Sequence, residues 1–182
     1  NHSEALEDID KALASNKDDR ELWLQKINLH GMSGDIGATE QAYKDWISQD
    51  ASDASRYKGQ AEFYAEQGNH KAAEAAYTQA IDKELYGDFA ALNSILGRAW
   101  ACLHQDNVAG AIEGFNQVIK LDAKLVDSYI GIAEARVKEG SIDAAITYLD
   151  LGLDIVQNDK WMLYNKKGVI HTKAENWEAA GA

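Results

Sequence analysis

Five histidines and a single cysteine are the side chains best suited to metal binding or nucleophilic chemistry. They are His2, His30, His70, His104 and His171, together with Cys102. No two histidines have the short spacing of a helical metal site, and no His-Glu-x-x-His motif occurs. Cys102 has no base beside it in the sequence, although a nucleophilic thiol needs one. His30, His171 and Cys102 share a repeat position with Tyr64, so we expect structural residues in or near a core.

The acidic pairs and the helix glycines do not form a recognisable catalytic or phosphate-binding motif either. Glu7-Asp8 and Asp18-Asp19 are typical of solvated faces and turns, and a general acid and base need to converge on one substrate. Gly59, Gly97 and Gly131 are isolated within helical patterns, unlike the glycines of a phosphate-binding loop. The sequence therefore predicts no catalytic residue, no metal site and no cofactor, and we expect a protein that is not an enzyme.

Composition excludes several classes of partner. The chain has 182 residues, 46% of them hydrophobic, and a formal charge of −12. Residues 1–53 account for −7 of this net charge, from 12 acidic and 5 basic side chains. Nucleic acids and anionic lipids require clustered Lys and Arg, so neither is expected as a partner. The acidity indicates either a cationic partner or simple solubility. No apolar run is long enough to insert into a membrane.

The ends of the sequence bear on its cellular location. The chain starts at Asn1 almost directly in a helical pattern, and it stops at Ala182 inside a repeat. We therefore expect a segment of a longer protein, so that any targeting sequence would lie outside this segment. Both a cytoplasmic and a periplasmic location remain open, and one cysteine does not distinguish them.

A ladder of small residues recurs along the whole chain. Its members are Ala5, Thr39, Ala73, Ala111, Ala145 and Ala180, separated by 34, 34, 38, 34 and 35 residues. A large apolar residue follows four positions later in each complete copy, at Ile9, Tyr43, Tyr77, Phe115 and Leu149. Self-similarity at this period predicts a stack of helix-turn-helix units rather than a fold with a single core.

The repeat boundaries follow from this ladder and from the breakers between helical patterns. We expect a half repeat at 1–19, complete repeats at 20–53, 54–87, 92–125 and 126–159, and a partial repeat at 161–182. The last repeat should contain a first helix from Trp161 to about Lys173 and the start of a second, which gives roughly eleven helices. Four extra residues near 84–91 predict a lengthened helix or a loop, either with ordinary stacking or with a bent junction.

The pattern resembles the tetratricopeptide repeat over nearly the whole chain. An early aromatic is followed by a small residue, as in Tyr57 and Ala61 or Tyr129 and Ala133. The stretch from Ala111-Ile112 through Phe115 to Leu121-Asp122 is close to the family consensus. The resemblance implies an all-α, right-handed superhelical solenoid whose first helices line a concave groove that holds peptides or partner helices.

The resemblance also places particular side chains on the inner face of that groove. They are Leu24, Asn28, Lys58, Glu62, Leu96, Trp100, His104, Ile130, Glu134 and Asn165, with Met32, Glu66, Lys138, Val169 and Lys173 further along the same helices. Trp100 is the strongest candidate, because aromatic residues often dominate binding energy; the alternative is that it packs on the neighbouring helix. Gly59, Gly97 and Gly131 share one position, which predicts either a bare groove floor or close helix packing.

The inner face combines apolar residues with carboxylates. It therefore predicts a non-catalytic scaffold for a protein or peptide with apolar anchors and positive charge. Two wider settings are open: residues 95–180 are similar to tetratricopeptide lipoproteins of bacterial tight-adherence pilus assembly, and the array suits the regulatory part of a larger enzyme or signalling protein. Self-association through unpaired terminal helices is a further expectation.

Overall fold

The structure is a computed structural model that describes residues 2–85, 87 and 89–180, with side chains as far as residue 173. This part of the chain is all-helical and contains no strand. Its elements are α1 (His2–Ser15), α2 (Arg20–Met32), α3 (Ile36–Gln49), α4 (Ala54–Glu66), α5 (His70–Lys83), α6 (Leu92–His104), α7 (Val108–Leu121), α8 (Val126–Lys138), α9 (Ile142–Ile155) and α10 (Lys160–Ala180).

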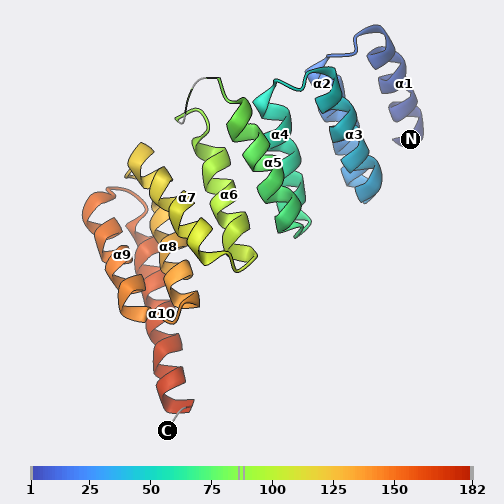
Figure 1. Cartoon of the computed structure of the whole chain (residues 1–182). Coiled ribbons are helices and arrows are strands. Elements are labelled where there is room, and N and C mark those ends of the chain that lie inside the picture. The colour runs from blue at the N-terminus through green and yellow to red at the C-terminus, as the bar shows by residue number, and fades with distance from the viewer. Residues whose placement is uncertain (1, 86, 88, 181–182) are drawn as a thin grey trace.

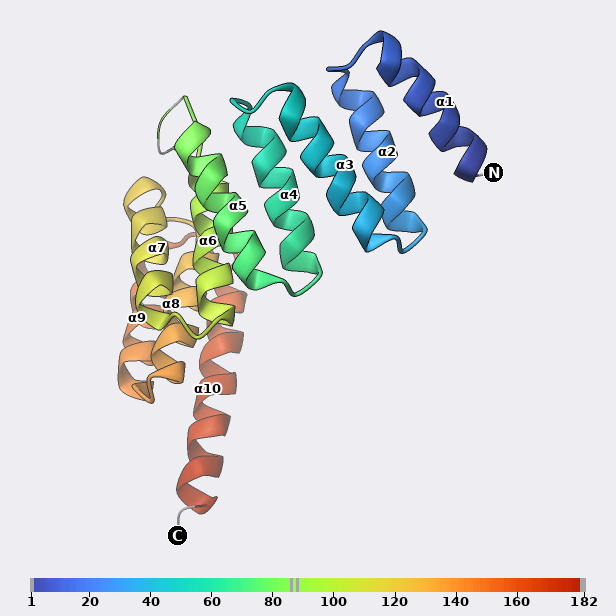
Figure 2. The ribbon, with the colours of Figure 1, turned by 45° about the vertical axis from the view of Figure 1, so that its right-hand side comes forward.

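Each helix packs against the next in antiparallel pairs, and the pairs stack into a right-handed superhelical solenoid (Figures 1 and 2). Contacts between α4 and α6, α6 and α8, and α8 and α10 join alternate helices into one layer. With α2, these helices form the inner layer, and α3, α5, α7 and α9 form the outer layer. The all-α superhelical solenoid predicted from the sequence is confirmed.

The turn inside each repeat depends on one residue in the left-handed region. Gly34, Gly68, Asp106 and Gly140 have φ of 72°, 71°, 60° and 76°. Glycine takes this conformation without a steric penalty, and aspartate tolerates it better than most residues. In the first three turns the next residue caps the following helix, since Asp35, Asn69 and Asn107 accept bonds from the backbone N–H groups of Ala38, Ala72 and Gly110.

The last predicted turn is absent. A first helix ending near Lys173 was expected, but α10 continues without a break to Ala180, so the described chain has ten helices instead of eleven. The position held elsewhere by glycine or aspartate falls here on Ala174 or Glu175, and neither favours the left-handed conformation. Figures 1 and 2 show α10 running past the ends of α8 and α9. The side chain of Ala180, the final member of the small-residue ladder, and residues 181–182 lie outside the described part.

The four extra residues form a loop rather than a longer helix. α5 ends at Lys83 and α6 begins at Leu92, and these two helices still pack directly on each other. Leu85 and Phe89 in this loop are exposed. Tyr86 and Asp88, which belong to the predicted insertion, lie outside the described residues.

In each of three inner helices, an aromatic residue near the start donates a hydrogen bond to the loop that precedes the helix. The Trp23 indole N–H donates to the Lys17 carbonyl at 2.8 Å, and the Tyr129 hydroxyl donates to the Ala123 carbonyl at the same distance. Tyr57 makes the equivalent bond to Ala51 at 3.3 Å. Each bond spans six residues, which explains why the sequence repeats an aromatic at this position.

Arg56 joins three segments near the N-terminal end of the solenoid, and its side chain is only 5% exposed. Its guanidinium donates to the Trp46 carbonyl at the end of α3, to Asp18 before α2, and to Asp53 at the start of α4. The guanidinium also lies 5.3 Å from the centre of the Trp46 ring. Burial alone would raise the pKa of Asp53, but bonds from Ser55 and Arg56 hold that pKa below its usual value.

Candidate functional site

The inner layer carries all ten side chains predicted to line the groove, and none of them is fully buried. Asn28, Glu62, His104 and Asn165 are exposed, and Lys58, Trp100 and Glu134 are half-buried. Leu24, Leu96 and Ile130 are partly buried against the apolar clusters between the layers. The last three therefore serve packing and offer only part of their surface to a partner.

The three glycines accommodate outer-layer aromatics. A Cβ built on Gly97 would lie 2.3 Å from Cζ of Tyr77, and one on Gly131 would lie 2.3 Å from Cζ of Phe115. At Gly59 the nearest atom is Cε1 of Tyr43, at 3.3 Å. The bare-floor interpretation is therefore wrong at Gly97 and Gly131, because an aromatic ring already occupies the space in front of each.

The same register explains why other repeats have no glycine. Tyr43 precedes Gly59 by sixteen residues, and Phe115 precedes Gly131 by the same number. In two other repeats the outer helix has an aliphatic residue at this position, and the residue sixteen positions later is an amide: Ile9 is followed by Gln25, and Leu149 by Asn165. An aromatic on the outer helix thus coincides with glycine on the next inner helix, and an aliphatic residue coincides with an amide. We call this relation size compensation between layers: at Gly97 and Gly131 the missing side chain makes room for the aromatic ring of the outer helix.

A cavity of about 570 Å³ lies between α2, α3 and α4. Its walls are Ile27, Asn28, Gly31, Met32, Thr39, Tyr43, Gly59, Glu62, Phe63 and Glu66. Met32 is 74% exposed and supplies an apolar rim. The cavity volume falls within the roughly 300–1,000 Å³ typical of ligand pockets and is large enough for a bulky side chain.

The electrostatic character of this cavity is negative. Glu62 pairs with Lys58 at 3.5 Å, whereas Glu66 forms no ion pair with a described side chain. Burial, followed by the charges of Glu62 and Glu66, raises the pKa of Tyr43 and of Tyr77 to about 12. Both phenols therefore remain protonated at neutral pH, and the carboxylates dominate the field over this part of the groove.

Trp100 stands at the middle of the inner layer. Its ring meets Phe115 edge-on at 5.0 Å and lies 6.3 Å from His104. It therefore packs on the neighbouring helix, as the alternative interpretation held, while part of its surface remains accessible. Its energetic role in binding stays a prediction.

Two histidines that the sequence pattern does not bring together are in contact in the structure. His70 and His104 stack with their ring centres 4.5 Å apart, at the start of α5 and the end of α6. Their separation of 34 residues gave no signal, because the repeat is 38 residues long here and the two rings lie at opposite ends of their helices. His171 is exposed and His30 half-buried, so the expected core position is wrong for His171. Across the described side chains, no three potential ligands come together at metal-binding distance.

Cys102 is buried, as expected. Burial, followed by the charge and hydrogen bond of Glu74, raises the pKa of its thiol to about 11. The thiol is therefore protonated at neutral pH and is a poor nucleophile.

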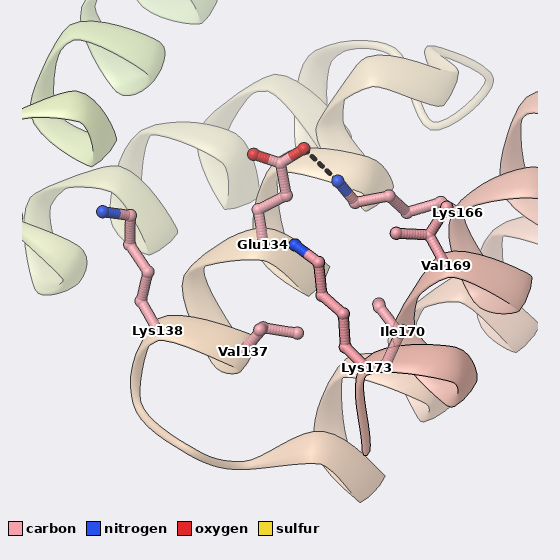
Figure 3. A pocket seen from close by; sticks show the side chains of 7 residues that line it. All are labelled: Glu134, Val137, Lys138, Lys166, Val169, Ile170 and Lys173. Atoms are coloured by element: carbon pink, nitrogen blue, oxygen red, sulfur yellow. Dashed lines mark hydrogen bonds and ion pairs between the residues drawn. The ribbon is translucent and has the colours of Figure 1, made fainter. Parts of the chain in front are cut away.

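A second, smaller cavity of about 190 Å³ lies between α8 and α10 at the other end of the inner layer (Figure 3). It is lined by Glu134, Val137, Lys138, Lys166, Val169, Ile170 and Lys173. Lysines outnumber carboxylates here, which is the reverse of the α2–α4 cavity. The inner layer therefore carries opposite charge at its two ends.

These features define a helical repeat solenoid whose inner layer contains two cavities. Residues 59–82 match the tetratricopeptide repeat family model. The structure resembles a crystal structure of MamA at 18% identity and TM-score 0.68, covering 84% of this chain and 81% of that one. YrrB, described as a tetratricopeptide protein with an unusual peptide-binding site, is similar at 16% identity and TM-score 0.65. That match covers 92% of this chain and 84% of the YrrB chain. A tetratricopeptide repeat protein from Parabacteroides merdae is similar at 16% identity and TM-score 0.74, and the match covers 99% of this chain and 70% of that one.

These likenesses show the fold alone, because the sequence identities are low. No curated protein matches the sequence. The similarity of residues 95–180 to tight-adherence pilus lipoproteins therefore stays a prediction. Self-association through the terminal helices also stays one, although Trp161 and Tyr164 of α10 are 67% and 61% exposed. None of the described helices is both long and apolar enough to cross a bilayer.

Proposed function

We propose that the chain is a non-catalytic scaffold that binds an extended or helical segment of another protein along its inner layer. The observation that carries this proposal is the acidic cavity between α2, α3 and α4, which combines apolar walls with Glu62 and Glu66. Tetratricopeptide repeats generally act as protein-interaction modules, and the structural neighbour YrrB is described as having a peptide-binding site.

The cavity suits a lysine or arginine side chain followed by an apolar residue. Met32 and Phe63 offer contact for an aliphatic stem, and Glu62 and Glu66 of the same lining supply carboxylates for its charged head. Both carboxylates belong to α4 and are one helical turn apart, so a single cation can reach either of them.

Two wider settings belong to the same proposal. As part of a bacterial pilus-assembly or secretion system, or as the regulatory array of a larger enzyme, the chain would use the same inner face. The sequence of the full-length protein distinguishes these settings: a lipobox cysteine upstream supports the first, and a catalytic domain supports the second.

Charge reversal in the acidic cavity tests the proposal. Peptides selected from a displayed random library against the chain should be enriched in Lys or Arg beside apolar residues. The double variant Glu62→Lys/Glu66→Lys should bind the best peptide with about tenfold lower affinity, since two attractive contacts become repulsive. Fluorescence anisotropy measures this affinity. Asp82→Lys/Glu113→Lys, the same charge change on exposed residues of outer helices, is the matched control. Equal weakening by both variants would assign the effect to net charge and overturn the proposal.

A further inference from the structure

We infer that the cavity between α8 and α10 is a second subsite, which takes an acidic residue next to an aliphatic side chain of the same bound segment. This inference rests on the proposed function and adds a charge polarity to it. A segment with its basic residues over α2–α4 and its acidic residues over α8–α10 would then bind in one direction only.

The apolar part of the subsite comes from Val137 on α8 and from Val169 and Ile170 on α10 (Figure 3). Val169 is 41% exposed. The volume of about 190 Å³ is below the range of roughly 300–1,000 Å³ for small-molecule pockets, and this size favours one inserted side chain over a complete ligand. The site therefore fits an aliphatic residue of a longer segment.

The lysines around the cavity are not equivalent. Lys166 forms an ion pair with Glu134, and Lys138 forms one with Asp106 across to the preceding repeat. Figure 3 shows Lys138 turned away from the centre of the cavity, whereas Lys173 extends over it. Lys173 forms no ion pair with a described side chain. It is therefore the cation best placed for a carboxylate of the partner.

Glu134 limits the affinity of the subsite for acids. Its carboxylate lines the cavity and occupies Lys166, so it both repels an incoming carboxylate and removes one cation from use. Removing its charge should consequently tighten the binding of an acidic segment, although the substitution deletes an ion pair. A purely structural role for this pair would give the opposite result.

The two ends of the inner layer are complementary to each other in charge. Glu66 at one end and Lys173 at the other each lack an ion pair with a described residue, while Glu62 and Lys166 are paired with their neighbours. Between the ends lies α6, with Trp100 and His104 and no acidic or basic residue in its inner-face positions apart from the histidine. A segment that spans both cavities thus meets acidic, aromatic and basic surfaces in a fixed order.

Peptide selection followed by anisotropy tests the subsite on the whole chain. Long displayed peptides should be enriched in Asp or Glu beside Leu, Ile or Val at one end, opposite to the basic end. With such a peptide, Lys173→Gln should weaken binding about threefold and Val169→Ser should also weaken it, while Glu134→Gln should tighten it about threefold. Lys120→Gln, an exposed lysine at the end of α7, is the matched control and should change nothing.

The outcomes separate this inference from the proposed function. Enriched peptides that are basic but have no acidic end would overturn the second subsite and leave the scaffold proposal intact. Unchanged affinity in Lys173→Gln, or weaker binding in Glu134→Gln, would also overturn the subsite. If selection enriches no peptide at all, both proposals fail.

Discussion

Replacing Gly131 with alanine is expected to lower the free energy of unfolding by about 2 kcal/mol, although alanine is the better helix former. The added Cβ would lie 2.3 Å from Cζ of Phe115, closer than any normal contact. Phe115 is 0% exposed and also packs edge-on against Trp100, so its ring has no free space to move into. The overpacking cost therefore exceeds the gain in helix propensity. Urea unfolding followed by circular dichroism measures the change.

Gly168 provides the matched control for this prediction. A Cβ built there meets no described atom within 4 Å, so Gly168→Ala should raise the unfolding free energy by up to about 1 kcal/mol. In the double variant Phe115→Leu/Gly131→Ala the smaller leucine side chain relieves the clash. The double variant should therefore lose at least about 1 kcal/mol less unfolding free energy than the two single variants lose together. Stabilisation by Gly131→Ala, or simple additivity in the double variant, would contradict the size compensation between layers.

Arg56→Ala is expected to lower the free energy of unfolding by about 3 kcal/mol, since it removes a buried cation that bonds to three segments. The loss would leave the Trp46 carbonyl without its 2.6 Å bond and the Asp53 carboxylate without its 3.1 Å ion pair. Because repeats stabilise mainly their neighbours, hydrogen exchange should rise chiefly in α2, α3 and α4, with little change in α8 and α9. Urea unfolding and amide exchange together measure the size and the location of the effect.

Two variants control the Arg56 experiment. Arg56→Lys keeps the charge but cannot bond three groups in one plane, so it should recover less than half of the loss. Lys44→Ala removes a surface pair with Glu40 and should cost about 0.5 kcal/mol or less. If Arg56→Ala costs no more than Lys44→Ala, the account of Arg56 as a junction between repeats is wrong.

The sequence predicted the helical units well because one local rule repeats. A small residue where helices approach and a left-handed residue at the turn are visible at Ala73 and Gly68 without any knowledge of tertiary contacts. The same rule explains the failure in α10. Repeat counting placed a turn near Lys173, but Ala174 and Glu175 lack the backbone freedom that Gly140 supplies in the previous repeat.

The candidate site was less accessible to sequence analysis. The repeat register identified the inner-face positions, including Glu62 and Glu134, but it does not specify which partner each charge finds. Lys166 reaches Glu134 from 32 residues away, so the basic character of the α8–α10 cavity appears only in three dimensions. The glycine register likewise left packing and binding open until Phe115 was located in front of Gly131.

The inner layer, and not the outer layer, is expected to bind the partner. The most direct measurement is an ¹H–¹⁵N correlation spectrum of the chain titrated with the best selected peptide. We expect the largest shift changes in α2, α4, α8 and α10 and at the Trp100 indole N–H, with little change in α3, α5, α7 and α9. Changes confined to the outer helices or to the loop between α5 and α6 would contradict the claim.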